Sequence, residues 1–169
     1  MDALLITKLV LAILVGVAML SDLIQMRIPN VVCLALALLF AITFVTGGSS
    51  IDILDHLMAM GIVLVSGIVL FSFRILGGGD VKLLTVLALW TGLKLLPVFI
   101  TLLSLVGGGQ VLLILLLRRY SHVFEYLLAK VNVTDSMPGW LRRGGEVPYG
   151  VAIGIALFIV MDKLPLFLS

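Results

Sequence analysis

The chain has 169 residues, of which 62% are hydrophobic and 12% charged, and its formal net charge at pH 7 is +2. Its mean hydropathy of +1.32 excludes an ordinary soluble domain, because a single core of this size cannot hold so many apolar side chains. The small net charge gives no indication of nucleic-acid binding, and the single cysteine, Cys33, excludes a disulfide framework or a cysteine-built zinc site within one chain. We therefore expect an integral membrane protein with one domain over residues 1–169.

Six apolar stretches follow one another along the chain, with lengths near the ~20 residues that a membrane-spanning helix needs. They cover roughly residues 3–20, 30–46, 56–73, 81–96, 97–117 and 147–166. They predict an all-α, polytopic protein with about six transmembrane helices. The first stretch opens with Asp2 instead of a cation, so we expect a retained helix and not a cleaved signal. Lys94 interrupts the fourth stretch, and Pro97 is expected to close it in a tight turn, because proline disfavours helical backbone in the residue before it.

The distribution of lysine and arginine predicts the orientation. Seven of these residues lie in the loops after the first, third and fifth stretches, and two lie outside the helices on the opposite side. The seven are Arg27, Arg74, Arg118, Arg119, Lys130, Arg142 and Arg143, and the two are Lys94 and Lys163. Since positively charged loops stay in the cytoplasm, both termini are expected to face outward.

The longest loop, about 118–147, is expected on the cytoplasmic side. Apolar residues recur at helical spacing within 123–131, between charged residues, which is typical of an amphipathic helix in the membrane interface. Trp140, beside two arginines, is expected to anchor the loop at the lipid headgroups. The loop is either a substrate-docking element or an anchored connector.

Two carboxylates lie on the expected cytoplasmic side. Asp22 follows the first apolar stretch, and Asp80 opens the fourth behind three glycines, Gly77 to Gly79. A charge at a membrane boundary is expensive and usually functional. Taken alone, each acid has a structural explanation. Asp22 would be a helix cap or a solvated loop residue, and Asp80 would cap the helix that begins at Val81. Together they form a candidate aspartyl dyad.

Such a dyad has a defined chemistry. Two carboxylates in a poorly solvated place cannot both ionise comfortably, so one keeps its proton and the other acts as general base. The pair activates a water that attacks a peptide carbonyl, and the acid then protonates the leaving amine. No metal or other cofactor is required. Gly77 and Gly79 would let an extended peptide approach Asp80, and Gly79 is expected to tolerate substitution worse than Gly108. Pro29 fits the first turn of the second helix.

Three segments resemble the motifs of the type IV prepilin peptidases, which are intramembrane aspartyl endopeptidases. The family signature Gly-x-Gly-Asp-x-Lys, which opens a helix, resembles residues 77–82. The family's first aspartate region and the motif that enters its last helix resemble residues 22–30 and 147–150. The matching residues are Gly77, Gly79, Asp80 and Lys82 in the signature, Asp22, Arg27, Pro29 and Asn30 in the first region, and Val147, Pro148, Tyr149 and Gly150 in the last.

The resemblance implies that Asp22 and Asp80 are the catalytic pair and that the substrate is a prepilin or pilin-like protein, with its positively charged leader in the cytoplasm and its hydrophobic helix in the inner membrane. Longer members carry paired cysteines in an N-terminal region and a methyltransferase activity. This chain opens at its first helix and has one cysteine, so methylation is not expected. The short form resembles the branch associated with Flp-type (Tad) pili.

Other polar residues and glycines leave alternatives open. Lys82 either tunes the dyad, holds substrate or extends to the membrane surface, and Arg27 has similar alternatives. Gly107, Gly108 and Gly109, which precede Gln110, are expected to permit close helix packing. On the outward side, His56 is expected to have no catalytic part, and Asp52→Asn and Asp55→Asn are expected to leave cleavage unchanged.

Two other functions are compatible with the composition. The first is a small proton- or cation-coupled transporter, although both acids near one membrane face do not form a route through the midplane. The second is a non-catalytic subunit of a pilus or secretion assembly. The oligomeric state is not indicated by the sequence.

Overall fold

The computed structural model describes residues 3–47, 52–119, 140, 145 and 147–168. Within these ranges every regular element is a helix. The helices are α1 (Ala3–Gln25), α2 (Asn30–Gly47), α3 (Ile53–Ser72), α4 (Gly78–Arg119), α6 (Tyr149–Val160), the 3₁₀ helix η2 (Met161–Lys163) and α7 (Pro165–Leu168). Four helical segments are long and apolar enough to cross a membrane, and α2 is a shorter apolar helix. The all-α, polytopic membrane fold is therefore confirmed.

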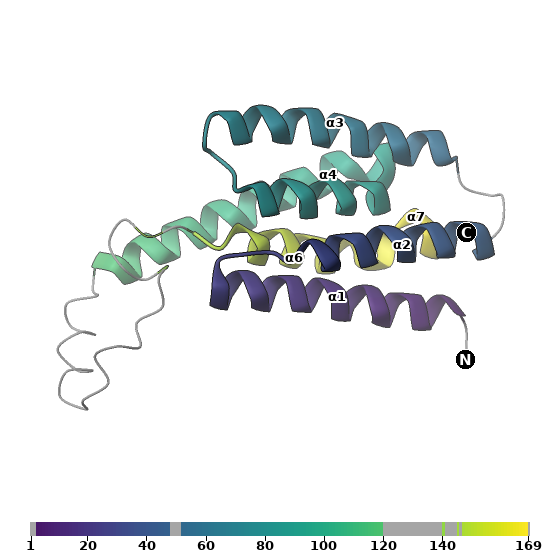
Figure 1. Ribbon diagram of the computed structural model, residues 1–169, viewed down its shortest axis with the longest axis horizontal. Helices are drawn as coiled ribbons and strands as arrows, with labels where there is room; N and C mark the ends of the chain where they lie inside the picture. Colours follow the sequence, from purple (N-terminus) through teal and green to yellow (C-terminus); the bar gives the residue numbers. More distant parts are fainter. Residues whose placement is uncertain (1–2, 48–51, 120–139, 141–144, 146, 169) are drawn as a thin grey trace.

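The helices lie side by side and alternate in direction (Figure 1). The connections 26–29 and 73–77 lie at one end of the bundle, which we call the loop end. The start of α1 and the short helix α7 lie at the other end, which we call the terminal end. The alternation predicted from the apolar stretches is thus present, and it gathers the segments after α1 and α3 at the same end.

The fourth and fifth apolar stretches meet at Gly92 and not at Pro97. Gly92 has φ 63° and ψ 172° inside α4, so α4 consists of a first leg, 78–91, and a second leg, 93–119, and the second leg runs back toward the loop end (Figure 1). The predicted boundary at Pro97 was wrong. A backbone with positive φ is open to glycine at little cost, whereas proline is tolerated in the early turns of a helix.

Two side chains from the start of α3 hold this reversal. The Leu93 N–H donates to Asp55 Oδ2 at 2.9 Å, and His56 Nδ1 donates to the Leu89 carbonyl at 2.6 Å. His56 is 1% exposed and lies against the Phe40 ring, with 5.4 Å between ring centroids. The two side chains thereby satisfy backbone groups that the break in α4 leaves without helical partners, as an apolar environment demands.

The last apolar stretch is also interrupted. It was predicted as one segment over 147–166, but α6 ends at Val160, and Leu164 is extended with φ −61° and ψ 133°. Leu164 precedes Pro165, and the proline ring disfavours helical backbone at the residue before it. The chain therefore turns through η2 into α7 at the terminal end.

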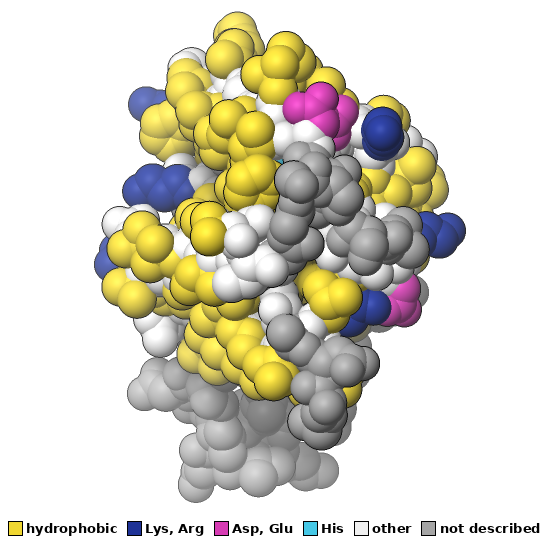
Figure 2. Space-filling model, turned by 90° about the vertical axis from the view of Figure 1, so that its right-hand side faces the viewer, with side chains coloured by type: hydrophobic (Ala, Val, Ile, Leu, Met, Phe, Trp, Pro, Cys, Tyr) yellow, Lys and Arg dark blue, Asp and Glu magenta, His cyan; other side chains and the backbone are white. Residues whose placement is uncertain are grey.

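One face of α1 is buried along its length and ends in a carboxylate. Leu11, Val15, Ala18 and Asp22 are all buried, at spacings of four, three and four residues that place them on one helical face. The opposite faces of the bundle expose large apolar side chains, including Leu5, Leu9, Ile13 and Ile24 of α1 and Ile62, Val65 and Phe71 of α3. Seen from the terminal end, hydrophobic side chains form much of the described surface, and charged side chains are scattered around them (Figure 2). This exterior suits a lipid environment.

The reversal at Gly92 predicts a strong substitution effect. An added Cβ would lie 2.5 Å from Asp55 Oδ2 and 3.2 Å from the His56 ring, and alanine would also be held at positive φ. We expect Gly92→Ala to reduce the free energy of unfolding by about 2 kcal/mol or more. Gly108→Ala is the matched control, since a Cβ there meets no described atom within 4 Å, and it should be neutral or stabilising by up to about 1 kcal/mol. Thermal melts in detergent that give equal shifts for both would contradict this account.

Candidate active site

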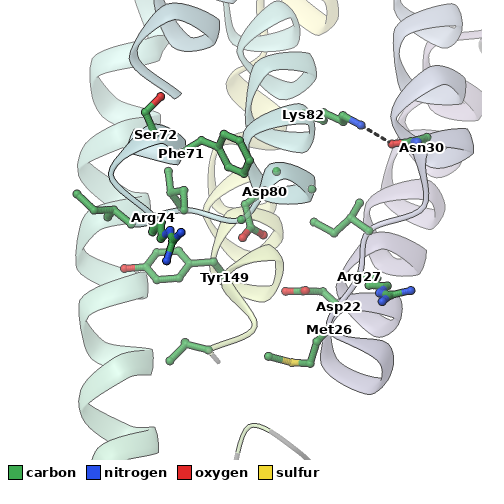
Figure 3. A pocket seen from close by; sticks show the side chains of 17 residues that line it. Asp22, Met26, Arg27, Asn30, Phe71, Ser72, Arg74, Asp80, Lys82 and Tyr149 are labelled. Atoms are coloured by element: carbon green, nitrogen blue, oxygen red, sulfur yellow. Dashed lines mark hydrogen bonds between the residues drawn. The ribbon is translucent and has the colours of Figure 1, made fainter. Parts of the chain in front are cut away.

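A cavity of about 990 Å³ lies at the loop end, between α1, α4 and α6 (Figure 3). It is lined by parts of the chain that are far apart in sequence, from the ends of α1 and α3 to the starts of α2, α4 and α6. The lining residues are Asp22, Met26, Arg27, Ile28, Asn30, Phe71, Ser72, Arg74, Ile75, Leu76, Gly77, Gly78, Gly79, Asp80, Lys82, Val147 and Tyr149. Both aspartates singled out in the sequence are among them.

Asp22 lies in the last turn of α1, so it belongs to the helix and not to the loop. It is only 5% exposed, and its Oδ2 accepts a 2.7 Å hydrogen bond from the Gly150 N–H at the start of α6. A Cβ on Gly150 would lie 2.8 Å from the same oxygen. Glycine is therefore needed at position 150 so that the backbone can approach the carboxylate.

Asp80 lies in the first turn of α4, which begins two residues earlier at Gly78. It therefore is not the residue that caps a helix starting at Val81, which was one of its alternative explanations. Its side chain is half-buried and points into the cavity (Figure 3). A Cβ on Gly77 would lie 2.9 Å from Asp80 Oδ2, so a side chain at position 77 would displace the carboxylate.

The two carboxylates thus enter one cavity from helices that are distant in sequence. Both carboxylates can therefore act on the same molecule bound in this cavity.

Lys82 and Asn30 are joined at the side of the cavity. Lys82 Nζ donates to Asn30 Oδ1 at 2.9 Å, which ties the first leg of α4 to the start of α2 (Figure 3). Both residues are exposed, so the bond adds little stability. The bond shows that Lys82 links two helices. The three roles considered from the sequence stay predictions.

Two non-glycine residues at the cavity have positive φ. Met26, just after α1, has φ 54°, and Arg74, just after α3, has φ 58°. At α3 the Arg74 N–H donates to the Phe71 carbonyl at 2.9 Å and the Ile75 N–H to the Leu70 carbonyl at 3.0 Å, the two bonds of a Schellman motif. Glycine usually occupies this position. Arg74 was used in the sequence only to count charges, and its place in the cavity wall was not predicted.

The remaining residues of the motifs have packing roles. Pro29 precedes the first residue of α2 and its carbonyl accepts from the Val32 N–H at 3.0 Å, so it lies just outside the predicted first turn. A Cβ on Gly79 would lie 3.3 Å from the Ile28 Cβ, whereas a Cβ on Gly108 meets no described atom within 4 Å. Gly79 therefore has a packing reason of its own, and substrate approach there stays a prediction. The packing expected at Gly108 is absent among the described residues.

Pro148 and Tyr149 are held by the second leg of α4. Gln110 Nε2 donates to the Pro148 carbonyl at 2.8 Å, and a Cβ on Gly107 would lie 3.2 Å from the Tyr149 ring. Tyr149 itself lines the cavity. Gln110 was not predicted as a site residue. The signal that was available is its side-chain amide, which stands alone among apolar residues in the stretch 105–117.

Most of the predicted amphipathic connector, 118–147, lies outside the described residues, including its apolar segment 123–131. Where the chain is described, Arg118 donates through Nε and Nη2 to the Trp140 carbonyl, at 2.9 and 2.7 Å, and through Nη2 to the Gly145 carbonyl at 2.7 Å. The end of the connector is therefore attached to the second leg of α4. In the described part of the chain no group of three or more His, Cys, Asp or Glu side chains is placed to hold a metal ion.

The two positive φ angles predict an unusual pair of stabilising substitutions. Glycine adopts this conformation without the steric cost of about 1–2 kcal/mol that other residues bear. Its greater freedom in the unfolded chain offsets part of this gain in stability. We expect Met26→Gly and Arg74→Gly each to raise the free energy of unfolding by up to about 1 kcal/mol, measured by thermal melts in detergent. A lower melting temperature for both variants would show that the side chains contribute more than the strained backbone costs.

Comparison with known protein families assigns residues 9–113 to the type IV leader peptidase family. This match covers more than half of the chain and includes α2, α3 and most of α1 and α4, with both aspartates. No curated protein and no solved structure matches the chain. The chain belongs to the type IV leader peptidase family, as its motifs and membrane fold had indicated, and it is a peptidase of the leader-peptidase type.

Proposed function

We propose that this protein is an intramembrane aspartyl endopeptidase that removes the leader peptide of prepilins or pilin-like proteins at the cytoplasmic face of the inner membrane. Asp22 and Asp80 form its catalytic dyad. We place it in the short branch of the family that is associated with Flp-type pili. One observation carries the proposal: two carboxylates from helices that are far apart in sequence line the same cavity.

Proton transfer in the dyad follows from the surroundings of the two acids. Asp22, which accepts the Gly150 N–H, is the better candidate for the charged base that withdraws a proton from water. Asp80, at the cavity wall, then carries the proton that goes first to the carbonyl oxygen under attack and afterwards to the leaving amine. Peptide hydrolysis forms one C–O bond from the water, breaks one C–N bond and moves protons, so the reaction has no redox step.

The proposed orientation rests on charge. Arg27, Arg74 and Lys82 line the same cavity as the aspartates, and Arg118 and Arg119 end the leg of α4 that runs back toward the loop end. Only Lys94 and Lys163 were counted on the opposite side. The loop end therefore has more of the positively charged residues that favour the cytoplasm. A prepilin with its hydrophobic helix in the membrane and its leader in the cytoplasm would present its cleavage site at this level.

The dyad predicts that either aspartate is indispensable. Asp22→Asn and Asp80→Asn each remove one proton-transfer partner with little change of volume, so leader cleavage should fall at least about 100-fold at equal amounts of folded protein. The measurement is the shift in size of a co-expressed or co-reconstituted prepilin. Cleavage near the wild-type rate by either variant would show that the aspartate is structural.

Asp52→Asn is the control for this experiment. Asp52 caps α3 by accepting the Leu54 N–H at 3.0 Å, and asparagine caps a helix equally well, so cleavage should be unchanged. Asp55 is less suitable, because it holds the reversal of α4, and Asp55→Asn is now expected to lower stability. A wild-type chain that inserts and folds but cleaves no prepilin would instead favour a non-catalytic assembly subunit.

A further inference from the structure

We propose that Gln110 is a positioning residue for Asp22, acting through the turn that enters α6. The inference rests on the proposed function, because it concerns how one member of the dyad is held. Gln110 lies on the second leg of α4, whereas Asp22 is on α1, and no motif of the sequence connects them. The connection is made by Pro148 and Gly150.

Two hydrogen bonds form the connection. Gln110 Nε2 donates to the Pro148 carbonyl at 2.8 Å, and two residues further along, the Gly150 N–H donates to Asp22 Oδ2 at 2.7 Å. The Pro148 carbonyl also accepts the Val151 N–H at 3.2 Å, the first bond of α6. Pro148 has no backbone N–H, so its carbonyl is the only backbone group of that residue that can form a hydrogen bond. Gln110 therefore fixes the point at which α6 begins.

One face of the second leg guides the chain into this turn. Gly107, Gln110, Ile114 and Arg118 follow one another at spacings of three, four and four residues, which places them on the same face. Arg118 holds the Trp140 and Gly145 carbonyls, Gln110 holds Pro148, and Gly107 lies against Tyr149, where an added Cβ would be 3.2 Å from the ring. The approach to α6 is thus held at three successive levels of one helix.

The position of the turn matters because the Asp22 carboxylate has almost no free space on the side that faces Gly150. A Cβ on Gly150 would lie 2.8 Å from Asp22 Oδ2, so a small shift of the turn either lengthens the hydrogen bond or presses the backbone against the carboxylate. Displacement of a reacting group by about 1 Å can cost roughly 100-fold in rate. Loss of the Gln110 bond should therefore reduce turnover without removing any group that touches substrate.

A purely structural role would give a different result. A hydrogen bond between helices in a membrane stabilises their packing modestly, and its loss would lower the melting temperature but leave the turnover of each folded molecule unchanged. The two roles are separated by measuring kcat and KM for prepilin cleavage at matched amounts of folded protein. A positioning residue affects kcat and leaves KM nearly constant.

The first test compares Gln110→Met with Thr101→Val. Methionine has nearly the shape of glutamine without the amide, and Thr101→Val also removes one side-chain bond to a backbone carbonyl of the same leg, from Thr101 Oγ1 to Pro97 at 2.8 Å. We expect Gln110→Met to lower kcat about tenfold or more, with KM changed less than about twofold, and Thr101→Val to leave both unchanged.

The second test uses two adjacent glycines of the same leg. Gly107→Ala would push against Tyr149 and displace the turn, whereas Gly108→Ala meets no described atom within 4 Å. We expect Gly107→Ala to lower kcat in the same way as Gln110→Met and Gly108→Ala to leave it unchanged. Since both effects act through one turn, the double variant Gln110→Met with Gly107→Ala should lose less than the product of the two single losses.

The outcomes separate this inference from the proposed function. If the wild type cleaves and Asp22→Asn does not, but Gln110→Met keeps the wild-type kcat per folded molecule, the proposed function stands and the positioning role is overturned. Independent, multiplicative losses in the double variant would also overturn it. If the wild-type chain cleaves no prepilin at all, the proposed function fails and the inference falls with it.

Discussion

The hydrogen bond from the Gly150 N–H to the Asp22 carboxylate is the contact on which the site depends. A carboxylate that is 5% exposed near an apolar bundle is costly unless polar groups meet it, and a backbone N–H at a helix start is such a group. The contact requires that α6 begin beside the last turn of α1 and that position 150 lack a side chain. The motif at 147–150, whose purpose cannot be read from the sequence, is explained by these two requirements.

The reversal of α4 imposes the second constraint, at the opposite end of the bundle. At 1.5 Å per residue the first leg is about 21 Å long and the second about 40 Å, so the second leg extends past the level of Asp80 toward the loop end (Figure 1). This extra length supplies Gly107, Gln110 and Arg118, which hold the entry to α6. Asp55 and His56, far from the cavity, therefore influence it by fixing the point from which both legs begin.

The helices, and the position of both aspartates at one end of the bundle, were largely predictable because their signals are local. Apolar runs separated by polar turns indicate the spans, and α2 begins at the residue expected, Asn30, because Pro29 precedes it. Asp22 also continues the buried stripe of α1 at helical spacing, so its inward direction is contained in the sequence. The break in α4 was placed wrongly because proline is the stronger local signal, whereas the choice of Gly92 depends on contacts with Asp55 and His56 from another helix.

The contacts that were missed are those between elements. Gln110 interrupts an apolar stretch, but nothing local indicates that its partner is the carbonyl of Pro148, on a different helix. Arg74 adopts a backbone conformation that favours glycine, and its sequence neighbours Ser72, Phe73 and Ile75 give no sign of it. Both features follow from how α3, α4 and α6 pack against one another, which a single sequence does not specify.

The relative position of the two aspartates depends on the packing of α6. Asp22 is on α1 and Asp80 on α4, and α6 packs against both of these helices. Small residues permit the close approach on each side: an added Cβ on Gly154 would overlap the Met19 side chain of α1, and Ala152 lies 3.7 Å from the position of a Cβ on Gly107 of α4. Because no backbone ladder joins α1 to α4, a change of side-chain volume on α6 would alter the geometry of the pair even though α6 contributes neither carboxylate. The hydrogen bond from Gly150 is thus one part of a larger contact, in which α6 packs against both helices that carry an aspartate, as α2 does from another side.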